Sequence, residues 1–135
     1  MGQQKLADGS YADMAVVSKA AVPGSWSYAA ASGGISNSTT AVTITAAAGT
    51  GLRNTIEAIQ ISADALGAAT EVVVRDGAAG TVLWRVKIGT GGNSGIAHTF
   101  AVPLRSTANT LLEVVTLTAS ITGAVYINVQ GGQAY

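Results

Sequence analysis

The chain has 135 residues, no cysteine and one histidine, and its seven basic and seven acidic side chains give a formal net charge of zero. This composition leaves few groups that can transfer a proton, attack a substrate or bind a metal, which argues against an enzyme and against a thiolate metal site. Hydrophobic residues make up 48% of the chain and charged residues only 10%, which favours a structural protein that buries part of its surface against other chains. We therefore expect a non-enzymatic protein with no cofactor and no metal ion.

The same features limit the domain count and the partners. The length is that of one domain, which can bury a continuous core without disulfides. The polar residues 1–14 argue against a secretory signal, and Leu6 interrupts the myristoylation pattern. No stretch is apolar over the roughly 20 residues of a membrane-spanning helix, so we expect no membrane partner. A pI near 6.5 and a single phenylalanine argue against a nucleic-acid partner, which would select a basic surface with exposed aromatic rings.

The first forty residues differ from the rest. Residues 1–22 are polar, Ser25–Tyr28 alternates in the manner of a strand, and residues 29–40 are small and polar. Two interpretations stay open for the last of these segments: a flexible linker, or an ordered arm that docks on a neighbour. The sequence thus predicts a partly extended N-terminal arm and linker over residues 1–40 and a β-sandwich domain over residues 41–135.

From Ala41 onwards, short runs rich in β-forming residues alternate with turn residues. The predicted strands are residues 41–45, 54–62, 70–76, 81–88, 98–104, 111–118 and 124–130. Residues 62–69 are compatible with a short helix, but Gly67 makes a loop equally compatible. Regularly spaced short strands predict an all-β fold, an antiparallel sandwich of about seven to nine strands, of which the jelly roll is one form.

Two local details refine this pattern. Strict alternation would place Ile56 and Ile59 on opposite faces, whereas a bulge near Ala58 would bring Ile56, Ile59 and Ile61 together. Pro103 lacks an N–H group and predicts an edge strand or a strand end.

The alternation also predicts a hairpin and a core. Asp76-Gly77 is a turn signal that joins two alternating runs into a β-hairpin with a short loop. The inward-facing positions are predicted to be Val72, Val74, Val82, Trp84, Val86, Phe100, Val102, Val125, Ile127 and Val129.

The candidate catalytic groups are few. His98 is the only imidazole base, and neither Ser94 nor Ser106 lies in a nucleophile-elbow pattern. We therefore expect His98 to be a strand-end or loop histidine that is hydrogen-bonded to the backbone. The glycine-rich residues 89–95 lack the Lys-Ser/Thr ending of a phosphate-binding loop and lead into a strand, so they predict a flexible loop.

Several charged residues lie in the middle of predicted strands. A pair of carboxylates among Glu57, Glu71 and Glu113 could serve glycoside hydrolysis, but nothing in their spacing selects that chemistry. Arg75 and Arg85 lie on similar strands. We expect these five residues to form ion pairs across strands on the outer face, or between subunits.

Five segments together resemble small virion proteins of tailed bacteriophages. They are Ile56-Glu-Ala-Ile-Gln-Ile-Ser62, Ala69-Thr-Glu-Val-Val-Val-Arg-Asp-Gly77, Val82-Leu-Trp-Arg85, Pro103-Leu-Arg105 and Val125-Tyr-Ile-Asn-Val-Gln-Gly131. The resemblance covers roughly residues 50–135 and excludes the N-terminal forty, so it concerns a single domain. Among such proteins the chain is most similar to head decoration (capsid cement) proteins, which lie as trimers on the capsid lattice.

The resemblance implies a role as well as a fold. The implied function is that of a structural virion protein that binds the outside of a phage capsid and stabilises the head lattice. The implied partners are the chain itself, as a homotrimer, and the major capsid protein. The implied location is the phage head surface, after synthesis in the host cytoplasm. The alternative is a tail- or fibre-associated module that binds a receptor or glycan in a shallow groove rimmed by exposed aromatic rings, with Trp26, Tyr28 or Tyr135 as candidates.

The N-terminal segment is a candidate capsid-contact arm. An extended arm adds contacts to several capsid subunits, and three arms on one trimer would bind with a high effective concentration. The candidate contacts are Lys5, Asp8, Asp13 and Lys19 for polar pairing and Met14, Val16 and Val17 for an apolar anchor. The alternative is a disordered tail without a role.

Overall fold

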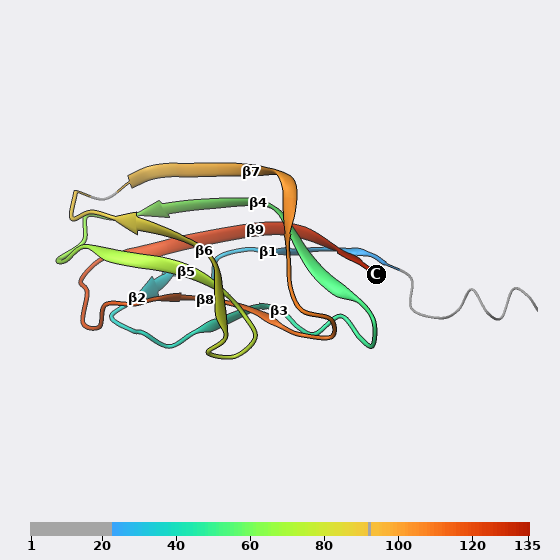
Figure 1. Cartoon of the computed structure of the whole chain (residues 1–135). Helices are drawn as coiled ribbons and strands as arrows, with labels where there is room; N and C mark the ends of the chain where they lie inside the picture. Colours follow the sequence, from blue (N-terminus) through green and yellow to red (C-terminus); the bar gives the residue numbers. More distant parts are fainter. Residues whose placement is uncertain (1–22, 92) are drawn as a thin grey trace, which may run out of the picture.

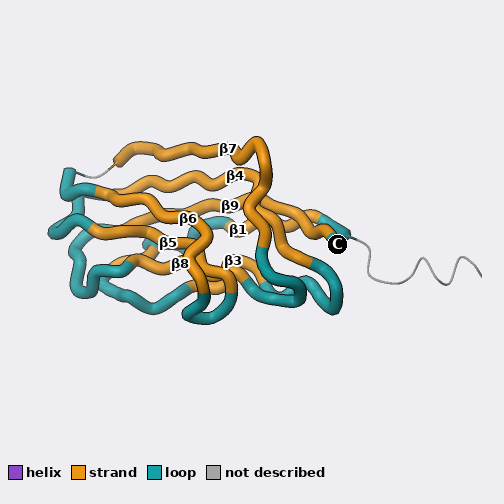
Figure 2. Tube along the Cα trace, viewed as in Figure 1, coloured by secondary structure: helices purple, strands orange, loops and turns teal. Residues whose placement is uncertain are grey.

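The computed structural model of the chain describes residues 23–91 and 93–135. This part of the chain contains no helix and folds as two antiparallel sheets packed on each other (Figures 1 and 2). The predicted antiparallel β-sandwich is therefore confirmed. Residues 62–69, for which a helix or a loop was compatible, contain the end of a strand followed by a loop.

Nine strands make up the described part. They are β1 (Ser25–Tyr28), β2 (Ile35–Ser36), β3 (Val42–Thr45), β4 (Arg53–Ala63), β5 (Thr70–Asp76), β6 (Thr81–Ile88), β7 (Asn93–Arg105), β8 (Leu112–Thr116) and β9 (Ala124–Ala134). The first sheet has the order β1-β9-β4-β7, with β2 also paired to β9, and the second has the order β3-β8-β5-β6.

The strand pairs are nested from the ends of the chain towards its middle. The strand β1 pairs with β9, β3 with β8, β4 with β7 and β5 with β6, always antiparallel. The short β2 continues β1 along β9, so the two act as one interrupted strand. A nested antiparallel ribbon that rolls into two sheets is the jelly-roll arrangement. The topology therefore selects the jelly roll among the sandwiches that the sequence allowed.

The strand boundaries follow the sequence most closely at the predicted hairpin. β5 and β6 match the predicted residues 70–76 and 81–88, and Gly77 in their connection has a φ of 90° that favours glycine. The strand β7 begins at Asn93, inside the predicted loop of residues 89–95, and it is an edge strand as Pro103 predicted.

The sandwich extends towards the N-terminus beyond the boundary predicted at Ala41. Both β1 and β2 are hydrogen-bonded to β9, so residues 25–36 belong to the first sheet rather than to a separate arm or linker. The candidate capsid-contact residues between Lys5 and Lys19 lie outside the described residues, and their role stays a prediction.

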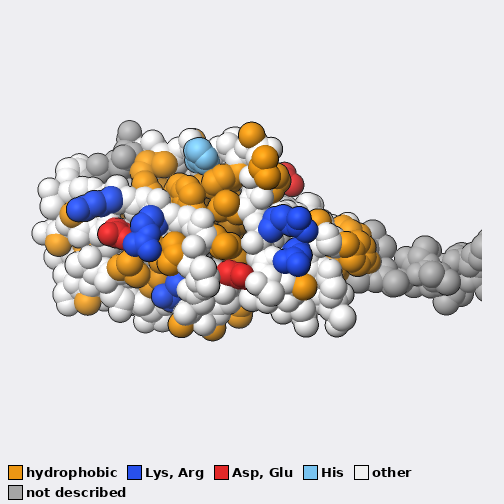
Figure 3. All heavy atoms as spheres, viewed as in Figure 1, with side chains coloured by type: hydrophobic (Ala, Val, Ile, Leu, Met, Phe, Trp, Pro, Cys, Tyr) orange, Lys and Arg blue, Asp and Glu red, His pale blue; other side chains and the backbone are white. Residues whose placement is uncertain are grey.

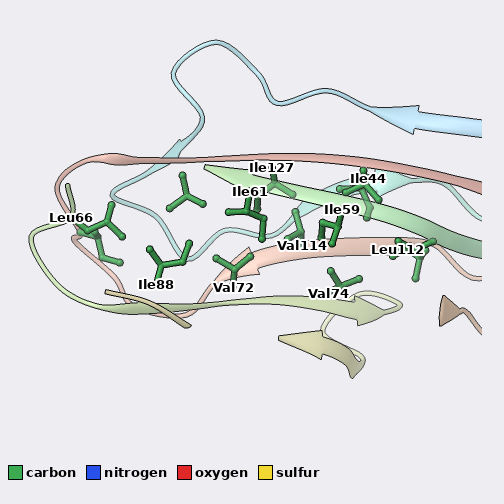
Figure 4. Close-up of a cluster of buried hydrophobic side chains, with 14 residues drawn as sticks. Ile44, Ile59, Ile61, Leu66, Val72, Val74, Ile88, Leu112, Val114 and Ile127 are labelled. Carbon is green, nitrogen blue, oxygen red and sulfur yellow. The ribbon is translucent and has the colours of Figure 1, made fainter. Parts of the chain in front are cut away.

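The bulge predicted in β4 is present, and it places three isoleucines in the core. The pairing of β4 with β9 shifts between Ile56 and Ala58, which leaves Glu57 as an extra residue without a partner. Ile56, Ile59 and Ile61 are therefore all at most 2% exposed. They pack between the sheets with valines and leucines of the second sheet (Figure 4).

Most of the predicted core positions face this cluster. Val72, Val74, Val125, Ile127 and Val129 are buried, and Trp84, Val86 and Phe100 pack against the margin of the cluster. The structure adds further core residues, namely Ile44, Leu66, Ile88, Leu112, Val114 and Ile121.

Val82 and Val102 were predicted as core positions but do not join the core, in both cases because the strand pairing is irregular there. A bulge in β6 pairs Val82 with Arg75 and leaves Leu83 as the extra residue, so Leu83 packs against the core instead. Val102 is 81% exposed, because β7 residues 100–103 all lie opposite the single extra residue Glu57, which interrupts the alternation of the strand.

Gly131 tests the close packing beside the β4 bulge. A Cβ atom there would overlap the Thr55 carbonyl oxygen and lie 2.6 Å from Cζ2 of Trp26. We expect Gly131→Ala to lower the free energy of unfolding by about 3 kcal/mol or more, the upper end of the cost of overpacking. Gly89→Ala is the control, because a Cβ at that position meets nothing within 4 Å. Equal urea midpoints for the two variants would contradict this account.

Candidate functional site

The outer face of the first sheet carries a shallow hollow of about 490 Å³, which we call the neutral groove. It lies on the face opposite the core, because its lining residues alternate with buried residues such as Ile59 and Val129. The outward-facing residues that line it are Ser27, Ala58, Gln60, Ala97, Thr99, Asn128 and Gln130.

These residues form two rows that run across the strands. The first row is Ser27, Gln130, Ala58 and Thr99, and the second is Asn128, Gln60 and Ala97. Small side chains beside long amides leave the hollow between them. The Asn128 carboxamide also accepts a hydrogen bond from the backbone N–H of Ala30 at 3.0 Å, which fixes its orientation.

The chemistry of the neutral groove is that of uncharged hydrogen bonding. The exposed amides of Gln60 and Gln130 make no side-chain hydrogen bond within the described residues, so both can donate to and accept from a ligand. Glu57, on the β4 bulge, borders an adjoining hollow that shares Ser27 and Gln130 with the groove. The arrangement suits a neutral polar partner such as an extended peptide or a carbohydrate.

Two of the aromatic residues that the sequence proposed for a binding rim point into the protein. Trp26 and Tyr28 pack against the core cluster, and Nε1 of Trp26 donates a hydrogen bond to the Gly132 carbonyl at 2.9 Å. Tyr135 is 65% exposed, and its carbonyl oxygen accepts a hydrogen bond from Arg105. The outward-facing lining of the groove therefore consists of amides and small side chains, while Trp26 and Tyr28 pack against the core and Tyr28 also borders the groove.

His98 lies within β7 and has aromatic rings as neighbours. Its ring centroid is 4.6 Å from that of Phe100 and 6.4 Å from that of Trp84. Trp84 meets Phe100 edge-on at 6.2 Å. These contacts join β6 to β7 at the side where the two sheets end, and hydrophobic side chains adjoin the exposed histidine in this view (Figure 3). His98 is thus part of an aromatic contact between the sheets rather than a strand-end or loop histidine bonded to the backbone.

The serine near His98 that the structure describes has a structural role. Ser106 is buried, donates its hydroxyl hydrogen to the Thr107 carbonyl at 2.8 Å and accepts from the Asn54 backbone N–H at 2.9 Å. Ser94 lies where side chains are not described. The Ser106 hydroxyl is therefore engaged in hydrogen bonds to the backbone.

The charged side chains form the expected pairs across strands. Glu71 binds Arg85, and Glu113 accepts hydrogen bonds from Nε of Arg75 at 2.7 Å and from the backbone N–H of Ala79 at 2.9 Å. Glu57 is separate from both pairs, on the β4 bulge. No group of three or more potential metal ligands occurs among residues 23–91 and 93–135.

No described segment is a helix that could cross a membrane. Comparison of the chain with known protein families, with curated protein sequences and with solved structures found no match. The class of the protein is therefore defined by its fold and surface: a jelly-roll β-sandwich with a neutral groove on the first sheet.

The sequence predicted both Trp84 and Val102 as core positions, but only Trp84 packs against the core, so the two side chains can be compared. We expect Trp84→Ala to cost about 2 kcal/mol of stability, less than the ~3–5 kcal/mol of a fully buried aromatic ring, because Trp84 is half-buried. Val102→Ala should change stability by less than about 0.5 kcal/mol, because this side chain is exposed. Thermal unfolding of both variants measures the difference, and an equal loss in the two would place Val102 in the core after all.

Proposed function

We propose that this chain is a structural virion protein that binds the outside of a phage capsid and stabilises the head lattice, without catalytic activity. It acts as a homotrimer whose partner is the major capsid protein. A hydrolase or transferase activity that His98→Ala abolishes would contradict the non-catalytic part of this proposal.

The neutrality of the described surface is the observation that carries the proposal. Arg75 and Arg85 are paired with glutamates of neighbouring strands, and Asp76 accepts hydrogen bonds from the backbone and hydroxyl of Thr107. Arg53 donates to a backbone carbonyl. The charges of the folded domain are thus used largely within the chain, and the neutral groove carries none. A surface of this kind gains by being covered by another protein, because little charge must be desolvated.

The resemblance to phage decoration proteins also falls on connected parts of the fold. Residues 69–77 and 82–85 form the β5–β6 hairpin, residues 103–105 end β7, and residues 125–131 lie in β9. Gly131, the last residue of these segments, lies where a side chain would collide with Trp26. The jelly roll is an architecture of viral capsid proteins and of lectins, which is a fold-level analogy and supports both a virion role and carbohydrate binding.

Deletion of residues 2–22 tests the contact with the capsid. We expect the shortened protein to fold and to form trimers normally, because the described sandwich begins at β1. Its binding to purified heads of the phage that encodes it should be weaker by about tenfold or more, because three linked contacts are lost at once. Co-sedimentation with heads measures the binding, and analytical ultracentrifugation measures the assembly. Undiminished binding would assign attachment to the sandwich, and a 13.4 kDa monomer at micromolar concentration would contradict the trimer.

The neutral groove supports a second candidate function, glycan binding by a tail- or fibre-associated protein. Exposed Gln60 and Gln130 amides with Asn128 offer the donors and acceptors that sugar hydroxyls need. In that case Gln60→Ala and Gln130→Ala should each weaken binding to a positive glycan by about five- to tenfold, the effect of one net hydrogen bond. Val102→Ala, outside the groove, is the control. A glycan array without any binding, together with retention on purified heads, would favour decoration.

A further inference from the structure

Glu57 differs from the other acidic side chains of the described sandwich because it has no partner within it. The other four carboxylates each accept a hydrogen bond or an ion pair from another strand or loop, namely Asp64, Glu71, Asp76 and Glu113. Glu57 is exposed and makes no hydrogen bond or ion pair with residues 23–91 or 93–135. Its carboxylate can therefore accept hydrogen bonds from a cation that another molecule supplies.

The Glu57 side chain extends from the β4 bulge towards the neighbouring strand β9 (Figure 1). Its Oε2 atom would lie 3.4 Å from a Cβ atom at Gly132. A hollow of about 500 Å³, which we call the Glu57 hollow, lies beside the carboxylate and is also lined by Ser25, Ser27 and Gln130. Bulges commonly re-aim side chains next to binding sites. Here the bulge places a carboxylate beside a hollow whose other polar side chains are uncharged.

The arginines at the same end of the first sheet are engaged elsewhere. Arg105, at the end of β7, donates to the Tyr135 carbonyl at 3.1 Å. Arg53, at the start of β4, donates to the Ser106 carbonyl at 3.1 Å. Neither forms an ion pair with Glu57. The carboxylate is therefore not neutralised by a contact with either of them.

We propose that the Glu57 hollow and the neutral groove together bind an extended polar segment of the major capsid protein, with a lysine or arginine of that segment paired to Glu57. The two hollows share Ser27 and Gln130, so they form one continuous surface. The exposed amides of Gln60 and Gln130 can hydrogen-bond the backbone of such a segment, whatever its side chains. The single carboxylate adds a contact that fixes the register of the segment.

The charge favours a protein segment over a glycan. A carboxylate in neutral surroundings attracts a cationic group, which lysine and arginine supply and a neutral glycan lacks. The inference rests on the proposed function. It deepens that function by naming the surface of the sandwich that faces the capsid and the kind of side chain that the capsid protein presents there.

Removal of the charge tests the contact. Glu57→Gln keeps the size of the side chain and should weaken binding to purified heads by about tenfold, the effect of one charge-assisted hydrogen bond. Glu57→Lys should weaken it further by repulsion. Glu71→Gln is the matched control, because it changes the net charge equally on β5 of the second sheet, where Glu71 pairs with Arg85. We expect this control to bind as the wild type does in co-sedimentation.

The salt dependence of binding separates a charge contact from a structural effect. Between about 50 and 200 mM salt, the wild type should lose more affinity for heads than Glu57→Gln, because salt screens the ion pair that the variant lacks. The urea midpoint of Glu57→Gln should equal that of the wild type, because Glu57 is exposed and has no partner within the described sandwich.

The other outcomes overturn the inference in distinguishable ways. Heads that do not retain the wild type would contradict the proposed function as well. Heads that retain the wild type and Glu57→Gln equally would overturn this inference alone. Equal weakening by Glu71→Gln would indicate an effect of net charge. Loss of binding to a neutral glycan in Glu57→Gln, with undiminished binding to heads, would make the Glu57 hollow part of a sugar site instead.

Discussion

The extra residue at Glu57 in β4 is the constraint on which the rest of the structure depends. It reverses the alternation of the strand, so that Ile56 faces the core together with Ile59 and Ile61. Beside it, β9 passes so close that position 131 accepts only glycine, with the Trp26 ring and the Thr55 carbonyl against it. One backbone irregularity in a central strand thus sets the packing of three neighbouring strands.

The same irregularity shapes the surface. On the β7 side, residues 100–103 lie opposite the single extra residue, and within this irregular stretch Val102 is exposed while Phe100 packs against the core. The regular pairing that resumes at Ala58 and Thr99 forms the first row of the neutral groove. The core packing and the groove are therefore parts of one local geometry.

The charged and aromatic side chains of the described surface are engaged largely within the chain. Glu113 and Glu71 each hold an arginine of a neighbouring strand, and His98 lies among the rings of Trp84 and Phe100. The groove offers amides and small side chains. Such a surface forms many weak, uncharged contacts, and these become effective when several copies bind together. Oligomerisation and attachment to a repetitive lattice fit this chemistry.

The sequence by itself determined the features that depend on neighbouring residues. The alternation of residues 70–76 and 81–88 and the Asp76-Gly77 turn predicted the hairpin, and the spacing of three isoleucines predicted the bulge in β4. Only the tertiary structure decided that β9 lies between β1 and β4, that four residues of β7 oppose Glu57, and that Val82 pairs with Arg75. The physical reason is that side-chain alternation specifies the two faces of one strand, whereas register and neighbours are selected by packing between residues far apart in the chain. The groove is assembled from four strands, so it depends entirely on register and strand order, which the sequence alone did not reveal.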